Sequence, residues 1–161
     1  MLLYLAHHGD AVSPGEDPQR PLSSLGRAQV ERLSGQAAQR GVRPRAIWHS
    51  GKLRARQTAE AYWRACNPLA EFSAARWMQP GDPPRIADLF LGEARDILLA
   101  GHMPHLDRLR RHLLGDNSTP SPPPFPLNGL VVLERLEPAD PIDPVEPGWQ
   151  ERWRLDAVTM A

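Results

Sequence analysis

The chain has 161 residues, enough for a sizeable core, and we expect residues 1–161 to form a single domain. Basic and acidic residues balance at 19 each, so neither nucleic acid nor a membrane surface is an expected partner. Cys66 is the single cysteine, which excludes an intramolecular disulfide and is typical of a reducing compartment. The N-terminal apolar run is too short for a signal peptide, so we expect a cytoplasmic protein.

Strands and helices are predicted to alternate along most of the chain. Short apolar runs that end at Gly or polar residues predict four strands, over 2–7, 45–49, 69–74 and 96–100. Helical spacing of apolar residues, with Ser23 and Asp82 as N-caps, predicts four helices, over about 25–41, 53–65, 82–91 and 104–114.

Two further strands are predicted near the C-terminus, over 129–136 and 149–155, joined as an antiparallel hairpin by a loop over 138–148. The Ser/Pro-rich stretch 116–128 is interpreted as a surface loop. This order predicts the α/β class: a three-layer α/β/α sandwich, with a mostly parallel sheet and a C-terminal antiparallel hairpin.

Imidazole and guanidinium groups follow the predicted strands. His7-His8-Gly9 ends the first strand, Arg54 comes soon after the second, Gly101-His102 ends the fourth, and Arg20 lies in the first loop. Parallel strands place their carboxyl ends along one edge of a sheet. Arginines there could neutralise phosphoryl oxygens, and an imidazole nitrogen could accept the phosphorus covalently. Taken singly, His49, His105 and His112 are interpreted as structural.

Three motifs in order resemble the histidine phosphatase superfamily, also called phosphoglycerate mutase-like. They are His7-His8-Gly9, where that family has Arg-His-Gly; Ser50-x-x-x-Arg54-Ala-x-x-Thr58-Ala; and Gly101-His102. The length and the run from Asp17 to Leu22 are similar to the short phosphohistidine phosphatase branch.

The resemblance implies a role for each matching residue. His8 would be the nucleophile, Arg54 and His102 would be catalytic and bind the phosphoryl oxygens, and His7 and Arg20 would add phosphate contacts. The implied reaction is metal-independent hydrolysis of phosphohistidine through a covalent intermediate, with no cofactor. The substrate would be a phosphorylated protein, such as a histidine phosphotransfer domain, or a small phosphorylated molecule.

The chain departs from the family at His7, where a permanently charged Arg is expected. We expect weak activity toward generic substrates, or a sharper acid optimum if His7 becomes charged below about pH 6.5. Asp82 and Asp88 are the carboxylates nearest to where larger members carry a proton donor, and Asp10 could orient the loop after the first strand.

Three alternatives remain open from the sequence. One is a phosphate- or phosphoprotein-binding module with little or no turnover, which the missing Arg favours. Another is a small-molecule phosphomonoesterase. The third is a metal hydrolase that uses the histidines at 7, 8, 49, 102 and 105, although no cluster of acidic ligands accompanies them.

Overall fold

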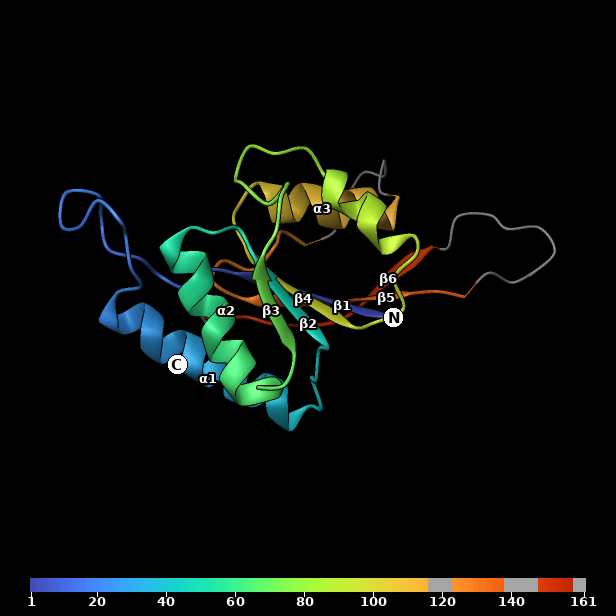
Figure 1. Cartoon of the computed structure of the whole chain (residues 1–161), viewed down its shortest axis with the longest axis horizontal. Coiled ribbons are helices and arrows are strands. Elements are labelled where there is room, and N and C mark those ends of the chain that lie inside the picture. The colour runs from blue at the N-terminus through green and yellow to red at the C-terminus, as the bar shows by residue number, and fades with distance from the viewer. Residues whose placement is uncertain (116–122, 138–147, 158–161) are drawn as a thin grey trace.

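The computed structural model describes residues 1–115, 123–137 and 148–157, which form a sheet with helices on both faces (Figure 1). The elements in chain order are β1 (Leu2–His7), α1 (Ser24–Gln39), β2 (Ala46–His49), α2 (Leu53–Cys66), β3 (Glu71–Ala74), η1 (Arg85–Phe90), β4 (Ile97–Gly101), α3 (His105–Leu114), β5 (Leu130–Arg135) and β6 (Trp149–Leu155).

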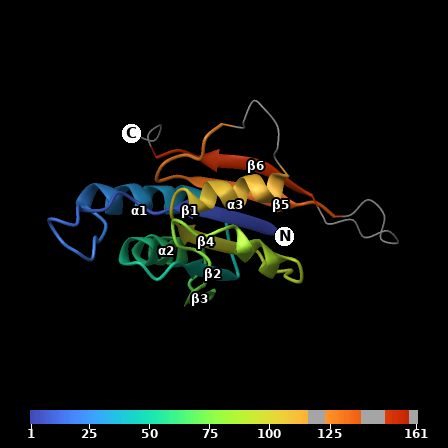
Figure 2. The same ribbon diagram turned by 90° about the horizontal axis from the view of Figure 1, so that it is seen from above.

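The six strands form one mixed sheet in the order β3-β2-β4-β1-β5-β6. The pairs β3–β2, β2–β4 and β4–β1 are parallel, whereas β5 is antiparallel to both β1 and β6. The carboxyl ends of β1, β2 and β4 therefore meet at one edge of the sheet, as predicted. Figure 1 shows α3 on one side of the sheet and α1 and α2 on the other, and Figure 2 shows the same arrangement from above.

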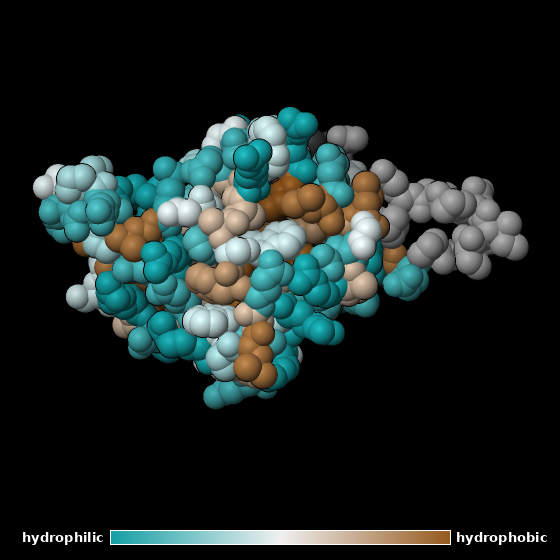
Figure 3. Space-filling model, in the orientation of Figure 1, coloured by the Kyte–Doolittle hydropathy of each residue, from teal (hydrophilic) through white to brown (hydrophobic). Residues whose placement is uncertain are grey.

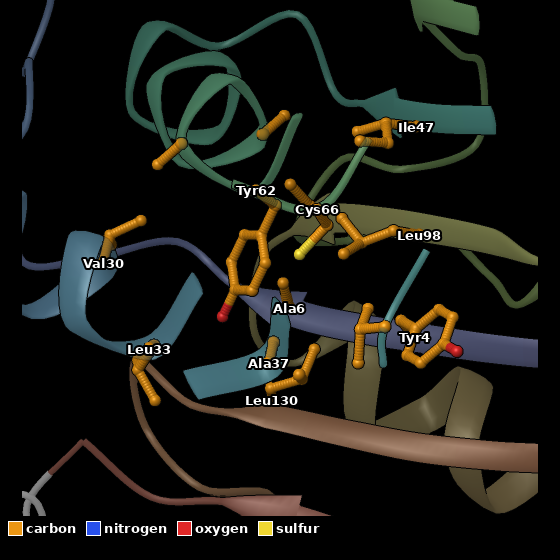
Figure 4. Close-up of a cluster of buried hydrophobic side chains, with 14 of the residues drawn as sticks. Tyr4, Ala6, Val30, Leu33, Ala37, Ile47, Tyr62, Cys66, Leu98 and Leu130 are labelled. Atoms are coloured by element: carbon orange, nitrogen blue, oxygen red, sulfur yellow. The ribbon is translucent and has the colours of Figure 1, made fainter. Parts of the chain in front are cut away.

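Alternate residues of the central strands enter two separate cores. Tyr4 and Ala6 point toward α1 and α2, where they pack with residues such as Leu33 and Tyr62 (Figure 4). Leu3 and Leu5 point the other way, toward η1 and α3. Because both faces are covered, β1 and β4 are almost entirely apolar, which is the pattern of a buried parallel strand.

The predicted strands and helices are present, with one correction. Residues 82–91 do not form an α-helix: the segment is the short 3-10 helix η1, preceded by Pro84 rather than capped by Asp82. Asp82 instead accepts the backbone N–H of Gln79 across a turn. Leu89 of η1 is 55% exposed, and Figure 3 shows an apolar patch over η1.

Most of the predicted hairpin loop 138–148 and the first part of the Pro-rich loop, residues 116–122, lie outside the described residues. In the part of the chain that is described, no helix is long and apolar enough to cross a bilayer.

Candidate active site

The end of β1 brings two adjacent histidines into one site. Neighbouring residues of a strand point to opposite faces, but β1 ends at His7, so the backbone is free to turn at His8. The ring centroids of His7 and His8 are 4.4 Å apart, and those of His8 and His102 are 5.1 Å apart. Three imidazoles from β1 and the end of β4 therefore lie together.

His8 is held in one tautomer. Its Nδ1 lies 2.7 Å from the carbonyl oxygen of Gly9, and because a carbonyl only accepts, Nδ1 carries the proton. The lone pair of the neutral ring is then on Nε2. Burial lowers the pKa of His8, the Gly9 hydrogen bond opposes that shift, and the charges of Arg54 and Arg20 lower the pKa further. His8 is thus a neutral imidazole whose Nε2 is unprotonated at pH 7.

His7 has the opposite tautomer. Its Nδ1 accepts the backbone N–H of Asn128 at 2.7 Å, which leaves Nε2 as the N–H donor of the neutral ring. Burial, together with the charges of His8 and Arg54, lowers the pKa of His7 to about 3. The prediction that His7 becomes charged below about pH 6.5 is therefore wrong, because desolvation disfavours the imidazolium.

His102 is joined to Ser50 at the end of β2. The Oγ of Ser50 lies 2.6 Å from Nε2 of His102 and also accepts the backbone N–H of Lys52. The other ring nitrogen, Nδ1, is buried without a hydrogen-bond partner. Burial, and then the charges of His8 and Arg54, lower the pKa of His102 to about 3. When Ser50 donates to Nε2, the neutral ring presents Nδ1–H as an unused donor.

The guanidinium of Arg54 supplies a cation to this site from the first turn of α2. Its charge acts on His7, His8 and His102, and its Nε is buried without a hydrogen-bond partner. Burial and the nearby Arg20 lower the pKa of Arg54 from its usual value. Arg20 approaches from the first loop, where its Nε donates to the carbonyl of Val12. Two guanidinium groups that repel each other in this way favour an anion between them.

The loop after β1 is anchored to α1 and α2. Asp10 accepts the hydroxyl of Ser23 at 2.5 Å on its carboxylate and the Ser23 N–H on its carbonyl, and Ser23 in turn caps α1. Thr58 accepts the N–H of Gly9 at 3.0 Å. A Cβ added at Gly26 would lie 2.0 Å from the Asp10 carbonyl oxygen, so only glycine permits this close approach. These contacts fix the backbone on which His8 sits.

Several other candidates lie away from the three imidazoles. His49 contacts Phe72, His105 is buried in the α3 helix, and His112 is exposed. Asp88 is exposed on η1 and lines a separate cavity with Arg135 and Trp149.

Two contacts of the site were not anticipated from the sequence. Asn128 bonds to both histidines, through its N–H to the His7 ring and through its side-chain amide to the His8 carbonyl at 2.8 Å. Its backbone is left-handed, with φ of 57°, and the Asn128-Gly129 pair is a recognisable turn signal. The Ser50–His102 bond was not predicted either, although Ser50 was part of a quoted motif.

A metal site is not formed by these side chains. Across residues 1–115, 123–137 and 148–157, no three His, Cys, Asp or Glu side chains are grouped so that they could hold an ion. Adjacent cations beside a neutral imidazole are better suited to an anion.

Comparisons with known proteins agree with this geometry. Residues 3–78 match the model of the histidine phosphatase superfamily, branch 1. The putative phosphohistidine phosphatase SixA from Agrobacterium tumefaciens has 27% sequence identity and a TM-score of 0.72, over 96% of both chains. No curated protein sequence gives a significant match.

Two more distant structures share the fold. The protein histidine phosphatase SixA in complex with tungstate has 20% identity and a TM-score of 0.80, over 100% of both chains. A mycobacterial glucosyl-3-phosphoglycerate phosphatase has 15% identity and a TM-score of 0.69, over 93% of this chain and 96% of its own.

The three motifs lie at the ends of β1, β2 and β4. Their position in the mixed sheet agrees with the family match. Residues 3–78 match the histidine phosphatase superfamily model, and the structure is SixA-like over nearly the full length of the chain.

Proposed function

We propose that this protein hydrolyses phosphohistidine on a protein through a covalent phosphoryl group on His8. The observation that carries the proposal is the His8 ring, whose Nδ1 is bound to the Gly9 carbonyl and which lies beside His102 and within reach of the Arg54 charge. A neutral imidazole nitrogen beside fixed cations suits attack on a bound phosphoryl group.

The first step would transfer the phosphoryl group to His8. Arg54 and His102 bind the phosphoryl oxygens while Nε2 of His8 forms a bond to phosphorus and the bond to the leaving nitrogen breaks. His7 adds one donor, its Nε2–H, and Arg20 adds charge from the loop. The leaving imidazole takes up a proton from water. In the second step water attacks phosphorus, the bond to His8 breaks, and inorganic phosphate leaves.

The surroundings of His8 support a leaving group that needs little acid assistance. The Asp82 carboxylate accepts the Gln79 N–H within a turn, and Asp88 lies on η1, where it lines a separate cavity. Asp10 is the carboxylate whose charge acts on His8, and it is hydrogen-bonded to Ser23. A phosphoramidate nitrogen is protonated more readily than an alkoxide, so this arrangement favours phosphohistidine over a phosphate ester.

The competing candidates are a small-molecule phosphomonoesterase and a phosphoprotein-binding module of low turnover. The phosphomonoesterase is favoured by the fold, because a glucosyl-3-phosphoglycerate phosphatase has the same fold. The second has the His7 departure in its favour, because one neutral donor replaces a charged fork.

An activity panel separates these candidates. Wild type and His8→Ala would be assayed on a histidine phosphotransfer domain phosphorylated on its histidine, on free phosphohistidine, and on sugar phosphates. We expect His8-dependent hydrolysis of the phosphohistidine substrates and little of the esters. Equal or faster hydrolysis of a sugar phosphate would favour the phosphomonoesterase, and binding without His8-dependent release of phosphate would favour the binding module.

A further inference from the structure

The segment between β3 and η1 lies beside the candidate active site. The N–H of Ala75 donates to the His49 carbonyl at 2.9 Å, and the Gln79 side chain donates to the Ser50 carbonyl at 2.8 Å. Met78 packs under Gly101, the residue before His102. Figure 1 shows the segment alongside the connection from β4 to α3. Residues 75–79 therefore border the side of the site formed by Ser50 and His102.

Trp77 lies in the middle of this segment and is turned outward. Its side chain is 40% exposed, although its neighbour Met78 is fully buried. Its φ of 64° is the left-handed conformation, which is unfavourable for a bulky residue that is not glycine. The guanidinium of Arg85 lies 4.4 Å from the centre of the Trp77 ring. The fold thus presents an indole face, stacked with a cation, at the edge of the site.

The charges around Trp77 have one predominant sign. Arg76 precedes Trp77 in the chain, Arg85 stacks on its ring, and both are exposed. Lys52, also exposed, comes two residues after Ser50, whose carbonyl accepts the Gln79 side chain. Asp82, the nearby acid, accepts a hydrogen bond within its own turn. Since the whole chain has no net charge, this positive surface is a local feature. Tryptophan and arginine are also the residues most often responsible for binding energy at protein interfaces.

We propose that Lys52, Arg76, Trp77 and Arg85, the Trp77 surface, dock the protein that carries the phosphohistidine, through an acidic surface next to its modified histidine. This inference rests on the proposed function and adds a partner site to it. The phosphoryl group enters between Arg54 and His102, while the protein around it contacts the indole and the arginines. Free phosphohistidine lacks the surrounding protein surface, so its hydrolysis should depend much less on the Trp77 surface.

The test compares a protein substrate with a small one. The value of kcat/KM would be measured for a phosphorylated histidine phosphotransfer domain and for free phosphohistidine, with wild type, Trp77→Ala and Arg85→Ala. Matched controls are Leu69→Ala and Arg43→Ala, exposed residues at the opposite edge of the sheet. We expect Trp77→Ala to lower kcat/KM for the protein about 10- to 100-fold. Its value for free phosphohistidine should stay within about twofold, and the controls should behave as wild type. An equal loss on both substrates, or no loss on the protein, would overturn the inference.

A binding measurement keeps this outcome separate from the proposed function. The dissociation constant of the phosphorylated domain would be measured for His8→Ala with and without Trp77→Ala, since that background cannot form the proposed intermediate. We expect at least tenfold weaker binding when Trp77 is also replaced, and weaker binding at higher salt. If wild type hydrolyses neither substrate, the proposed function fails. If adding Trp77→Ala to His8→Ala leaves the dissociation constant unchanged, the docking inference fails independently.

Discussion

The backbone N–H of Asn128 donates to Nδ1 of His7 at 2.7 Å, and this bond determines how His7 can contact an anion. It leaves a single neutral donor, Nε2–H, where relatives are expected to carry a bidentate cation. Because burial holds the pKa of His7 at about 3, acidification within the native range does not restore that charge.

The first prediction concerns His7→Arg. If the imidazole is a weakened phosphate contact, a guanidinium should raise kcat/KM about 10-fold or more at pH 7, since a charged donor stabilises the transition state by a few kcal/mol. The measurement is the rate on free phosphohistidine between pH 5 and 8, with His7→Gln as the uncharged control. No gain at neutral pH would mean that His7 is not a weakened substitute for Arg.

The second prediction is a loss of stability in mild acid. His7 and His102 both have pKa values of about 3 in the folded protein, against an ordinary value of 6.5. Between these values the unfolded chain binds protons that the native protein does not, so stability should fall as pH drops below about 6.5. Each histidine contributes a slope of at most about 1.4 kcal/mol per pH unit.

Urea unfolding at intervals from pH 7 to 5 would measure this slope, in a window chosen to lie above the ordinary carboxylate range. His7→Gln should have a shallower slope than wild type, because one of the histidines whose pKa is lowered by folding is removed. Identical slopes, or a flat profile through pH 6, would contradict the assignment of His7 as a buried neutral imidazole.

The third prediction concerns Asn128, which is both a turn residue and a positioning residue. Asn128→Gly keeps the left-handed backbone and the N–H to His7, and removes only the amide bond to the His8 carbonyl. It should cost about 1 kcal/mol of stability, while Asn128→Ala should cost about 1–2 kcal/mol more through its φ of 57°.

Nitrogen chemical shifts of the His7 ring provide a second readout for these two variants. Asn128→Gly should leave Nδ1 unprotonated, because the donor is the backbone, while lowering kcat/KM as the His8 backbone loosens. If both variants match wild type in stability and rate, Asn128 does not position the two histidines.

The fourth prediction compares two glycines of the same helix. Gly26→Ala would place a Cβ 2.0 Å from the Asp10 carbonyl oxygen and must push the His8 loop away from α1. We expect a loss of about 1–3 kcal/mol and a fall in kcat/KM. Gly35 has no atom within 4 Å of an added Cβ, so Gly35→Ala should stabilise the protein by about 0.5–1 kcal/mol. Thermal and urea unfolding of the two variants would show whether the contact with the Asp10 carbonyl accounts for the difference in their stability.

The fold could be predicted from the sequence because its strands are buried on both faces. The apolar runs of β1 and β4 predict buried strands, and Ser23 predicts the start of α1. The segment 82–91 was harder to predict, since consecutive prolines and a few apolar residues are compatible with either helix type. In the structure it is a 3-10 helix whose buried residues join the core on the α3 side of the sheet.

The site could be predicted only in part. His8, Arg54 and His102 came from motifs at strand ends, which the parallel sheet brings together. The tautomers of these histidines could not be predicted from the sequence, because they depend on contacts between distant segments. Asn128 contacts His7, and Ser50 contacts His102. The burial that lowers the pKa of His7 is likewise a property of the folded chain.

The covalent intermediate tests the central claim most directly. Wild type would be mixed rapidly with a phosphorylated histidine phosphotransfer domain and quenched in alkali, and the phosphorylated residue would be located by mass spectrometry, with His8→Ala as the blank. We predict a transient phosphoryl group on His8 that forms and decays at rates consistent with turnover, and none in His8→Ala. Turnover without a phosphoenzyme, or with the phosphoryl group on another residue, would contradict the account.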